Sequence, residues 1–250
     1  MKILAGGCRV FAAGDGLRGA DGLRRFRSTI CRETGAREIA QAVTEYGRGR
    51  APARVNPTAE QVLYIARGWG TCRVAGFEYA VEPGAGVYIP PGAPWSMENP
   101  SDEPLVVVSV CCPEEQAQEA EEPATPAGER PRLIVHERER EAIPSGDRRF
   151  KYMVDKDLGC RQITQFVGFI PPSKAPFHSH TYEEGIYILE GTGVVHTEAE
   201  STDFGPDTCI YLPPGTRHCL ENPGEAAVRL LGVFYPSGSP AARYDEDQDG

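Results

Sequence analysis

The segment 176–193, PFHSHTYEEGIYILEGTG, carries three potential metal ligands, His178, His180 and Glu184, at even spacings. A fourth candidate, His218, follows in the stretch PPGTRHCLEN. Successive side chains of a β-strand point to opposite faces, so His178 and His180 are expected to share one face, and Glu184 keeps the same parity. Three imidazoles and one carboxylate favour a divalent first-row transition metal over calcium or a structural thiolate zinc site.

These two stretches resemble the two sequence motifs of the cupin family. The first motif reads here as His178, one residue, His180, three residues, Glu184, six residues and Gly191. The second reads as Gly205, Pro213, Gly215, His218 and Asn222. The glycine that usually opens the first motif is absent, and Pro172 stands at about that spacing. The resemblance implies an antiparallel jelly-roll barrel that holds one divalent transition metal on His178, His180, Glu184 and His218.

An internal repeat extends this interpretation to the first half of the chain. QVLYIARGWGTCRV (61–74) aligns with EGIYILEGTGVVHT (184–197), and VYIPPGAPWSMENP (87–100) with IYLPPGTRHCLENP (210–223), both at a shift of 123 positions. Further upstream, RFRSTICRETGAREI matches RFKYMVDKDLGCRQI at a shift of 124. Short apolar runs separated by Gly, Pro and Asn predict strands and turns in both copies. We therefore predict an all-β protein of two tandem antiparallel jelly-roll barrels, a bicupin in the terms of the family.

The repeat also suggests domain boundaries. An N-terminal barrel is expected over 1–112 and a C-terminal, metal-binding barrel over 132–237. Between them, residues 113–131 form an acidic Pro/Glu/Ala linker, and the stretch PEEQAQEAEEPATPAGER within it has six Glu, three Pro and no large apolar residue. Residues 238–250 are expected to be a flexible tail.

Composition narrows the class of protein. With 250 residues and a net charge of −10, the chain is not expected to bind nucleic acid, because phosphate contacts need clustered Lys and Arg. The sequence contains no stretch of about 18 apolar residues, so no membrane span is expected. The eight cysteines include no CxxC pair, which favours free, buried thiols in a reducing cytoplasm. A small-molecule substrate and a homodimer are the expected partners, the dimer by family resemblance and by the frequency of symmetric oligomers.

The first copy lacks the ligand set of the second. At a shift of 123, the four candidate positions fall on Val55, Pro57, Gln61 and Trp95, and an insertion near 50–60 would move the first two to Arg54 and Asn56. Neither alignment supplies a histidine, and one neutral amide does not hold a transition metal. The N-terminal barrel is expected to be a metal-free scaffold, lid or dimerisation element. A ligand pocket lined by Trp95 and Tyr64 is the alternative.

Several residues near the ligands have expected positions. His196 shares the parity of the ligands and is a candidate acid/base residue, as is Glu184 after it shifts off the metal. Glu183, of opposite parity, is expected outside the site, Tyr182 at its entrance, and Cys219 facing away from the metal. The specificity-determining wall of the cavity is inferred from strand parity as Gln165, Ile186, Ile188, Leu220 and Phe234.

The site allows more than one activity. Four protein ligands leave about two adjacent positions open on an octahedral ion, for a chelating substrate or for a substrate and dioxygen. By family resemblance, an oxygenase acting on a small oxygen-bearing organic substrate is the first hypothesis, with Fe or Mn favoured and Zn, Ni, Co or Cu possible. A non-redox isomerase, lyase or decarboxylase of a sugar acid or keto acid is the second, although oxalate-type activity is disfavoured because bicupins with it usually carry metal in both domains. A metal-bearing binding module without catalysis is the third.

Overall fold

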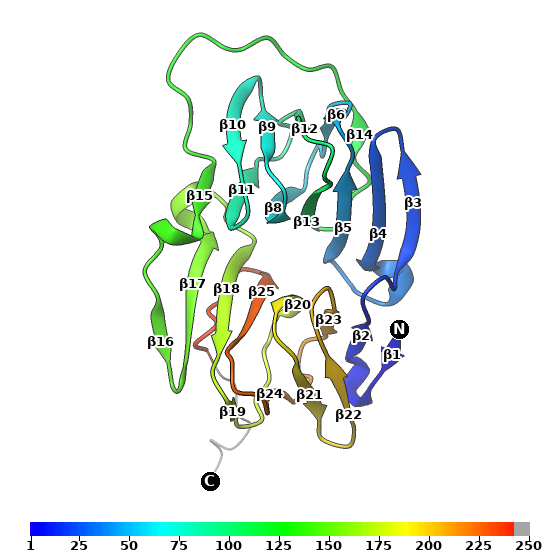
Figure 1. Cartoon of the computed structure of the whole chain (residues 1–250), viewed down its shortest axis with the longest axis vertical. Helices are drawn as coiled ribbons and strands as arrows, with labels where there is room; N and C mark the ends of the chain where they lie inside the picture. Colours follow the sequence, from blue (N-terminus) through cyan, green and yellow to red (C-terminus); the bar gives the residue numbers. More distant parts are fainter. Residues whose placement is uncertain (243–250) are drawn as a thin grey trace.

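The computed structural model describes residues 1–242, which form two stacked β-barrels (Figure 1). The strands of the first half are β1 (Lys2–Ile3), β2 (Arg9–Phe11), β3 (Leu17–Asp21), β4 (Arg24–Ile30), β5 (Ala40–Tyr46), β6 (Gly49–Arg50), β7 (Arg54–Val55), β8 (Glu60–Arg67), β9 (Gly70–Val74), β10 (Phe77–Val81), β11 (Ala85–Ile89), β12 (Trp95–Asn99), β13 (Leu105–Cys112) and β14 (Gln118–Glu119). The strands of the second half are β15 (Ile134–His136), β16 (Ile143–Ser145), β17 (Arg148–Val154), β18 (Thr164–Ile170), β19 (Ser173–Lys174), β20 (Glu183–Glu190), β21 (Gly193–Thr197), β22 (Ser201–Phe204), β23 (Cys209–Leu212), β24 (His218–Asn222) and β25 (Val228–Tyr235). Four single-turn 3₁₀ helices join them: η1 (Ala5–Gly7), η2 (Arg32–Thr34), η3 (Glu137–Glu139) and η4 (Lys156–Leu158).

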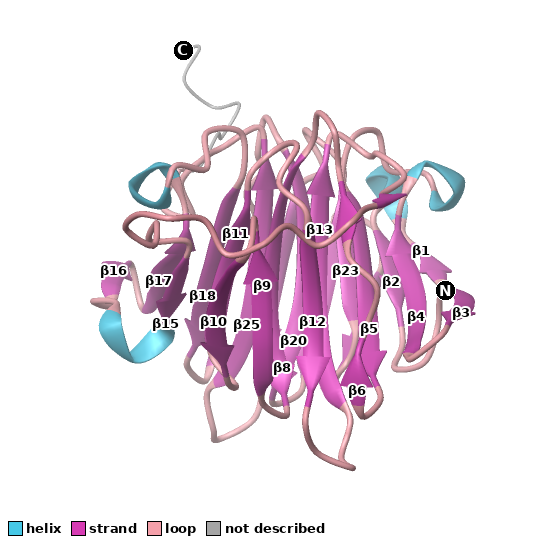
Figure 2. Cartoon of the chain, turned by 90° about the horizontal axis from the view of Figure 1, so that it is seen from above, coloured by secondary structure: helices cyan, strands magenta, loops and turns pink. Residues whose placement is uncertain are grey.

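Each barrel pairs a large sheet with a small one. In the N-terminal barrel the order is β15-β11-β8-β13-β5-β4-β3 against β10-β9-β12-β7-β14, with β6 beside β12. In the C-terminal barrel it is β1-β2-β23-β20-β25-β18-β17-β16 against β19-β24-β21-β22. The strand pairings between these elements are antiparallel, and Figure 2 shows the strands running in roughly one direction with loops gathered at their two ends. The prediction of two tandem jelly-roll barrels is confirmed.

The two halves exchange their first strands, which the predicted boundaries did not anticipate. Strand β2 pairs with β23 of the second half, matching Val10 to Ile210. Reciprocally, β15 pairs with β11 of the first half, matching Val135 to Gly86. In Figure 1 strands β1 and β2 accordingly lie beside β23 in the lower barrel. Residues 1–11 thus belong to the C-terminal barrel and 134–136 to the N-terminal one, so neither 1–112 nor 132–237 is a closed structural unit.

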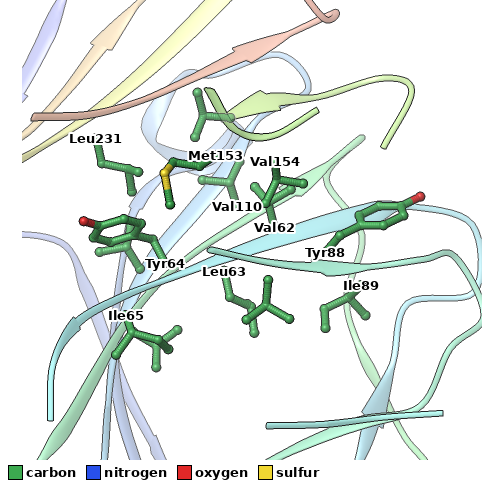
Figure 3. Close-up of a cluster of buried hydrophobic side chains, with 14 of the residues drawn as sticks. Val62, Leu63, Tyr64, Ile65, Tyr88, Ile89, Val110, Met153, Val154 and Leu231 are labelled. Carbon is green, nitrogen blue, oxygen red and sulfur yellow. The ribbon is translucent and has the colours of Figure 1, made fainter. Parts of the chain in front are cut away.

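The large sheets of the two barrels pack face to face. Figure 3 shows Val62 and Tyr64 of β8 with Met153 of β17 and Leu231 of β25 in one buried cluster. Strands covered on both faces carry continuous apolar sequences, which explains the runs VLYI, LVVVSV and VRLLGVFY. The inter-barrel contact is therefore hydrophobic core rather than a solvated domain boundary.

Two buried carboxylates secure this contact in a pseudo-twofold arrangement. Glu183 of β20 accepts hydrogen bonds from the backbone N–H groups of Arg37, Glu38 and Ile39 in the other half, at 2.7, 2.8 and 3.2 Å. Its repeat partner Glu60 accepts from the N–H groups that follow Cys160, at 2.9 and 2.8 Å. The hydroxyl groups of Tyr211 and Tyr88 donate to Glu183 and Glu60, respectively. Glu183, expected outside the site, does point away from it, but into the inter-barrel interface, where it is 3% exposed.

The acidic segment 113–131 lies along the N-terminal barrel. Its strand β14 pairs with β7, and Figure 1 shows the chain continuing as an arch over the end of the barrel. Glu115 accepts from the N–H groups of Thr58 and Ala59, and Glu122 accepts from the hydroxyl of Ser96. The carboxylates that predicted a solvated linker thus hold the segment to the barrel surface.

Three further sequence predictions concern the cysteines, the C-terminal tail and membrane spans. All eight cysteines are free and buried. Of the tail 238–250, residues 238–242 contact the C-terminal barrel, where the Tyr182 hydroxyl donates to the carbonyl of Ser239 at 2.9 Å, and 243–250 lie outside the described residues. Within 1–242, no helix is long and apolar enough to cross a bilayer.

Candidate metal centre

The histidines come from two segments that the backbone brings together. His178 lies in the extended stretch before β20 and forms an isolated antiparallel bridge with His218, the first residue of β24. The two residues exchange N–H to carbonyl hydrogen bonds of 3.0 and 2.9 Å. The carbonyl of His180 accepts from the N–H of Gly215 at 2.8 Å, which ties the same stretch to the turn before β24. The HxH segment is therefore held by the turn after β23 rather than by a regular strand.

The three imidazoles converge as the sequence predicts. One ligand nitrogen from each of His178, His180 and His218 lies within 4.8 Å of the others. Glu184, at the start of β20, places its Oε2 atom 3.6 Å from His180 Nε2 and 3.8 Å from His218 Nε2. These separations suit four donors around one cation.

Hydrogen bonds from Nδ1 to backbone carbonyl oxygens orient two of the imidazole rings. His218 Nδ1 lies 2.9 Å from the carbonyl oxygen of Thr216, and His178 Nδ1 lies 3.2 Å from that of Pro176. A carbonyl oxygen accepts only, so it fixes the proton on Nδ1 and leaves Nε2 as the lone-pair donor. This is the usual arrangement of metal-binding histidines.

Burial opposes charge on two of the four ligands in the absence of a cation. Desolvation raises the pKa of Glu184 to about 8, and desolvation with the neighbouring His178 lowers the pKa of His218 to about 3. Glu184 is 6% exposed, and its Oε2 atom receives no hydrogen bond from the described residues 1–242. A buried carboxylate oxygen without a donor calls for a cation, and the neutral imidazole of His218 is ready to bind one. The residues present therefore fit a divalent transition metal.

The cluster lies at a small cavity of about 90 Å³. Of the predicted wall residues, Ile186, Leu220 and Phe234 line it. The other two do not: Ile188 lies in the barrel core, and Gln165 is buried at the inter-barrel contact, where its Oε1 atom closely approaches Gly86. Ile188 shares the face of Ile186 but lies at another depth along the barrel, so parity was right there and depth was not. Gln165 lies on the opposite face of β18 from Phe166, which lines the cavity, so the parity assigned to this strand was wrong.

Arg148 also lines the cavity, and the sequence analysis missed it. This residue opens β17, and its guanidinium donates to the carbonyl of Leu220. The repeat held the signal, because Arg24 precedes RFRSTICRETGAREI just as Arg148 precedes RFKYMVDKDLGCRQI. An arginine retained at the same place in both barrels is a candidate for binding an anion.

Two predicted neighbours of the metal lie elsewhere. His196 of β21 is opposite Cys219 in β24, whereas Thr197 is opposite His218, so His196 faces away from the ligands. Its Nε2 atom lies 2.7 Å from Glu221 Oε2, and it is not an acid/base residue of this cavity. Tyr182 does not rim the entrance: it is 5% exposed and stacks on His180 with ring centroids 4.9 Å apart.

The first barrel shows what replaced the ligands. Trp95 of β12 pairs with Arg54 of β7, as His218 pairs with His178. Gln61 pairs with Ile89, as Glu184 pairs with Leu212. The register thus places Arg54, Asn56, Gln61 and Trp95 at the four ligand positions, and the inserted residue lies between Asn56 and Gln61. Tyr64 lies at the inter-barrel contact, with its hydroxyl 2.9 Å from Arg229 Nη2, and not in a pocket with Trp95.

Comparisons with known proteins agree with this architecture. Among solved structures, a glyoxylate-induced protein of Pseudomonas aeruginosa superposes with a TM-score of 0.76 at 18% identity, over 95% of this chain and 92% of that one. Oxalate decarboxylase of Bacillus subtilis, which has Mn(II) centres, gives 0.75 at 16% identity, over 90% of this chain and 76% of its own. Identities this low show the fold alone.

Sequence relatives match only in part. An uncharacterized protein of Methanocaldococcus jannaschii is 40% identical over 65 residues, 26% of this chain and 52% of its own length. Mannose-1-phosphate guanylyltransferase of Salmonella montevideo is 38% identical over 56 residues, 22% of this chain and 12% of its own. The profile of the cupin domain matches residues 42–111 and again 166–234, one match in each barrel and together more than half of the chain. This chain therefore belongs to the cupin family and carries two cupin domains.

Proposed function

We propose that the C-terminal barrel is the active site of a metal-dependent enzyme that acts on a small organic acid. The observation that carries this proposal is the convergence of three imidazoles on a small cavity, with Glu184 beside two of them and Arg148 in the cavity wall. His178, His180, Glu184 and His218 would hold the metal. The Mn(II) centres of the B. subtilis fold relative support Mn or Fe over Zn, Ni, Co and Cu.

The size of the cavity limits the substrate. About 90 Å³ is far below the roughly 300–1,000 Å³ of pockets for drug-sized ligands. A flavonol or another fused-ring compound does not fit, whereas an acid of a few carbon atoms does. Phe150, Phe166 and Phe234 make part of the wall apolar, which limits the water that can reach the ligands. Exclusion of water strengthens the charge interactions inside.

Arg148 supplies the recognition of an acid. Its guanidinium is a fixed positive charge with paired donors, the geometry that suits a carboxylate. A substrate carboxylate held there would have a neighbouring carbonyl or hydroxyl oxygen directed to the histidine cluster. The cavity thus favours substrates in which two oxygen-bearing groups lie on adjacent carbons.

Proton transfer falls to Glu184. A bound divalent metal would supply Lewis-acid polarisation of a substrate oxygen or, if redox-active, electrons for oxidation. With His196 outside the cavity, Glu184 remains the acid/base candidate among the predicted residues, in a state in which it has left the metal. A carboxylate that binds the metal is deprotonated, and the raised pKa of about 8 belongs to the metal-free side chain. A cavity of this small volume, with Arg148 in its wall, favours a lyase, decarboxylase or isomerase of a small acid. Oxygenation stays the second candidate, because four protein ligands leave room for substrate and dioxygen side by side.

Loading the purified protein with Mn(II) or Fe(II) and presenting it with small 2-keto, 2-hydroxy and dicarboxylic acids tests the proposal. We expect turnover of one acid without oxygen consumption. Product analysis measures the turnover, and an oxygen electrode measures the oxygen consumed. Arg148→Gln is expected to raise KM about tenfold or more, since a charge-assisted pair is lost. Oxygen uptake in step with substrate loss would move the assignment to an oxygenase. Tight metal binding with no turnover of any acid would leave a binding module.

Metal affinity is expected to depend on pH through Glu184. The raised pKa of about 8 means that below pH 8 a proton competes with the metal for this carboxylate. Affinity should therefore rise about fivefold from pH 7 to pH 8 and less than twofold from pH 8 to pH 9. His218, with a pKa of about 3, stays neutral throughout. Chelator competition at each pH measures this. Glu184→Gln should remove the dependence, and an equally steep profile in that variant would contradict the assignment.

A homodimer in the cytoplasm completes the proposal, by analogy with symmetric oligomers and from the reduced state of all eight cysteines. Light scattering of the purified chain measures the mass directly. A mass of one chain, about 27.2 kDa, would rule the dimer out.

A further inference from the structure

The N-terminal barrel encloses a larger cavity than the C-terminal one. Its volume is about 440 Å³, against about 90 Å³ at the histidine cluster. Smaller side chains at repeat-equivalent positions account for part of the difference. Ala42 stands where β18 has Phe166, and Cys111 where β25 has Phe234. The cavity opens between Leu17, Glu33 and Gln116, which are exposed.

The inner end of this cavity carries the residues that replaced the metal ligands. Arg54, Asn56, Gln61 and Trp95 all line it, together with Arg24, the repeat counterpart of Arg148. The substitution converts a set of lone-pair donors into a set of hydrogen-bond donors. The guanidinium group of Arg54 thus places a positive charge where a bound metal would place one in the other barrel.

Several buried polar atoms at this end lack a hydrogen-bond partner among the described residues 1–242. Trp95 is 7% exposed, and its indole Nε1–H has no acceptor among these residues. Asn56 is 2% exposed; its Nδ2 donates to Gln61 Oε1 at 2.6 Å, and its Oδ1 atom has no donor. The Nε atoms of Arg24 and Arg54 are also without acceptors. A buried donor without an acceptor is costly, so such groups gathered around a space mark a site for a polar ligand.

The charges around the cavity select the ligand. Arg24 and Arg54 both pair with Asp21, whose side chain is 43% exposed, so two guanidinium groups share one partly solvated carboxylate. Among the other lining acids, Glu115 is held by the N–H groups of Thr58 and Ala59. Glu114 accepts from the N–H of Arg32 near the mouth. Glu33, the third lining acid, is exposed at the mouth. The donors at the inner end include two guanidinium groups and an indole N–H, with the Tyr46 hydroxyl beside Arg24.

We propose that the N-terminal barrel binds a small hydroxy acid, with its carboxylate on Arg24, Arg54 and the Trp95 indole and its hydroxyl on Asn56. The lining lacks the histidine cluster of the other barrel, and its carboxylates Glu114 and Glu115 accept from backbone N–H groups, so we assign the site binding rather than conversion of the acid. The proposal is independent of the reaction assigned to the C-terminal barrel. The two sites are separable because each has its own arginine.

Trp95 makes the site directly measurable. The chain has two tryptophans, and Trp69 is exposed, so the Trp69→Phe variant leaves Trp95 as the single reporter in the cavity wall. In metal-free protein that also carries His178→Ala, titration with L-malate is expected to give a saturable change in Trp95 emission. Malamide, the uncharged analogue, should give none. A malate titration without saturation would overturn the proposal.

Two further variants locate the carboxylate. Arg54→Gln should weaken malate binding at least about tenfold, since a charge-assisted contact is lost, and Arg54→Lys should retain part of it. Asp21→Asn, at a half-exposed position, should tighten binding several-fold because it frees both guanidinium groups. A melting temperature within a few degrees of the parent shows that each variant is folded. Unchanged affinity in Arg54→Gln, or weaker binding in Asp21→Asn, would refute the site.

Discussion

Replacement of His218 by alanine is expected to reduce the metal content of the protein from about one ion per chain to near zero. The imidazole is 3% exposed, its Nδ1 proton is fixed on the carbonyl of Thr216, and its backbone is bridged to His178. Its removal deletes one ligand and the ring contacts with His178 and His180, while the backbone bridge to His178 stays in place. Loss of outer partners of a metal ligand already costs about 10–100-fold in affinity, so loss of this ligand should exceed 100-fold.

His196→Ala is the matched control. It removes a histidine one strand away that faces the opposite side of the sheet and binds Glu221. Elemental analysis after dialysis, and competition with a chelator, should show parent-like metal content in this variant. If His196→Ala lost the metal while His218→Ala kept it, the site would have to be reassigned.

Replacement of Glu183 by alanine is expected to destabilise the whole molecule by about 3 kcal/mol or more. The change leaves three backbone N–H groups in the segment 37–39, that of Ile39 buried and the other two partly buried, and the Tyr211 hydroxyl without their acceptor. For a chain of this size, the melting temperature should fall by roughly 6–12 °C. Thermal unfolding followed by circular dichroism measures the change.

The pseudo-twofold arrangement supplies an internal check. Glu60→Ala removes the equivalent carboxylate from the other barrel and should cost a similar amount. Glu198, whose side chain is 69% exposed beside Arg217, is the surface control, and its replacement by alanine should change stability by less than about 0.5 kcal/mol. A fall no greater for Glu183→Ala than for Glu198→Ala would show that these contacts contribute little to the joining of the barrels.

The prediction for His196 was wrong because strand parity does not pass through a turn. His196 has the even numbering of the ligands, but Gly191, with a φ of +85°, lies between β20 and β21. The pairing of β21 with β24 then places Thr197, not His196, opposite His218. Parity within one segment is local geometry, whereas the facing of the next strand depends on its pairing partner.

The ligand positions in the first barrel show the same limit. The sequence left Val55 and Pro57 open against Arg54 and Asn56, because one inserted residue could lie at several places. The backbone pairing of Arg54 with Trp95 decides between them. Only with that register does the first barrel show an arginine where the second has a histidine.

What the sequence determined by itself is local or repeated: the strand pattern, the duplication, and four ligands whose spacing matches two motifs, because periodicity and turn residues act over a few positions. What only the tertiary structure decided is long-range: the exchange of β2 and β15 between barrels, the burial of Glu183 and Gln165 at their contact, and the two cavity volumes. These features depend on which segments pair across more than a hundred residues, and hydrophobic periodicity is identical for every possible partner.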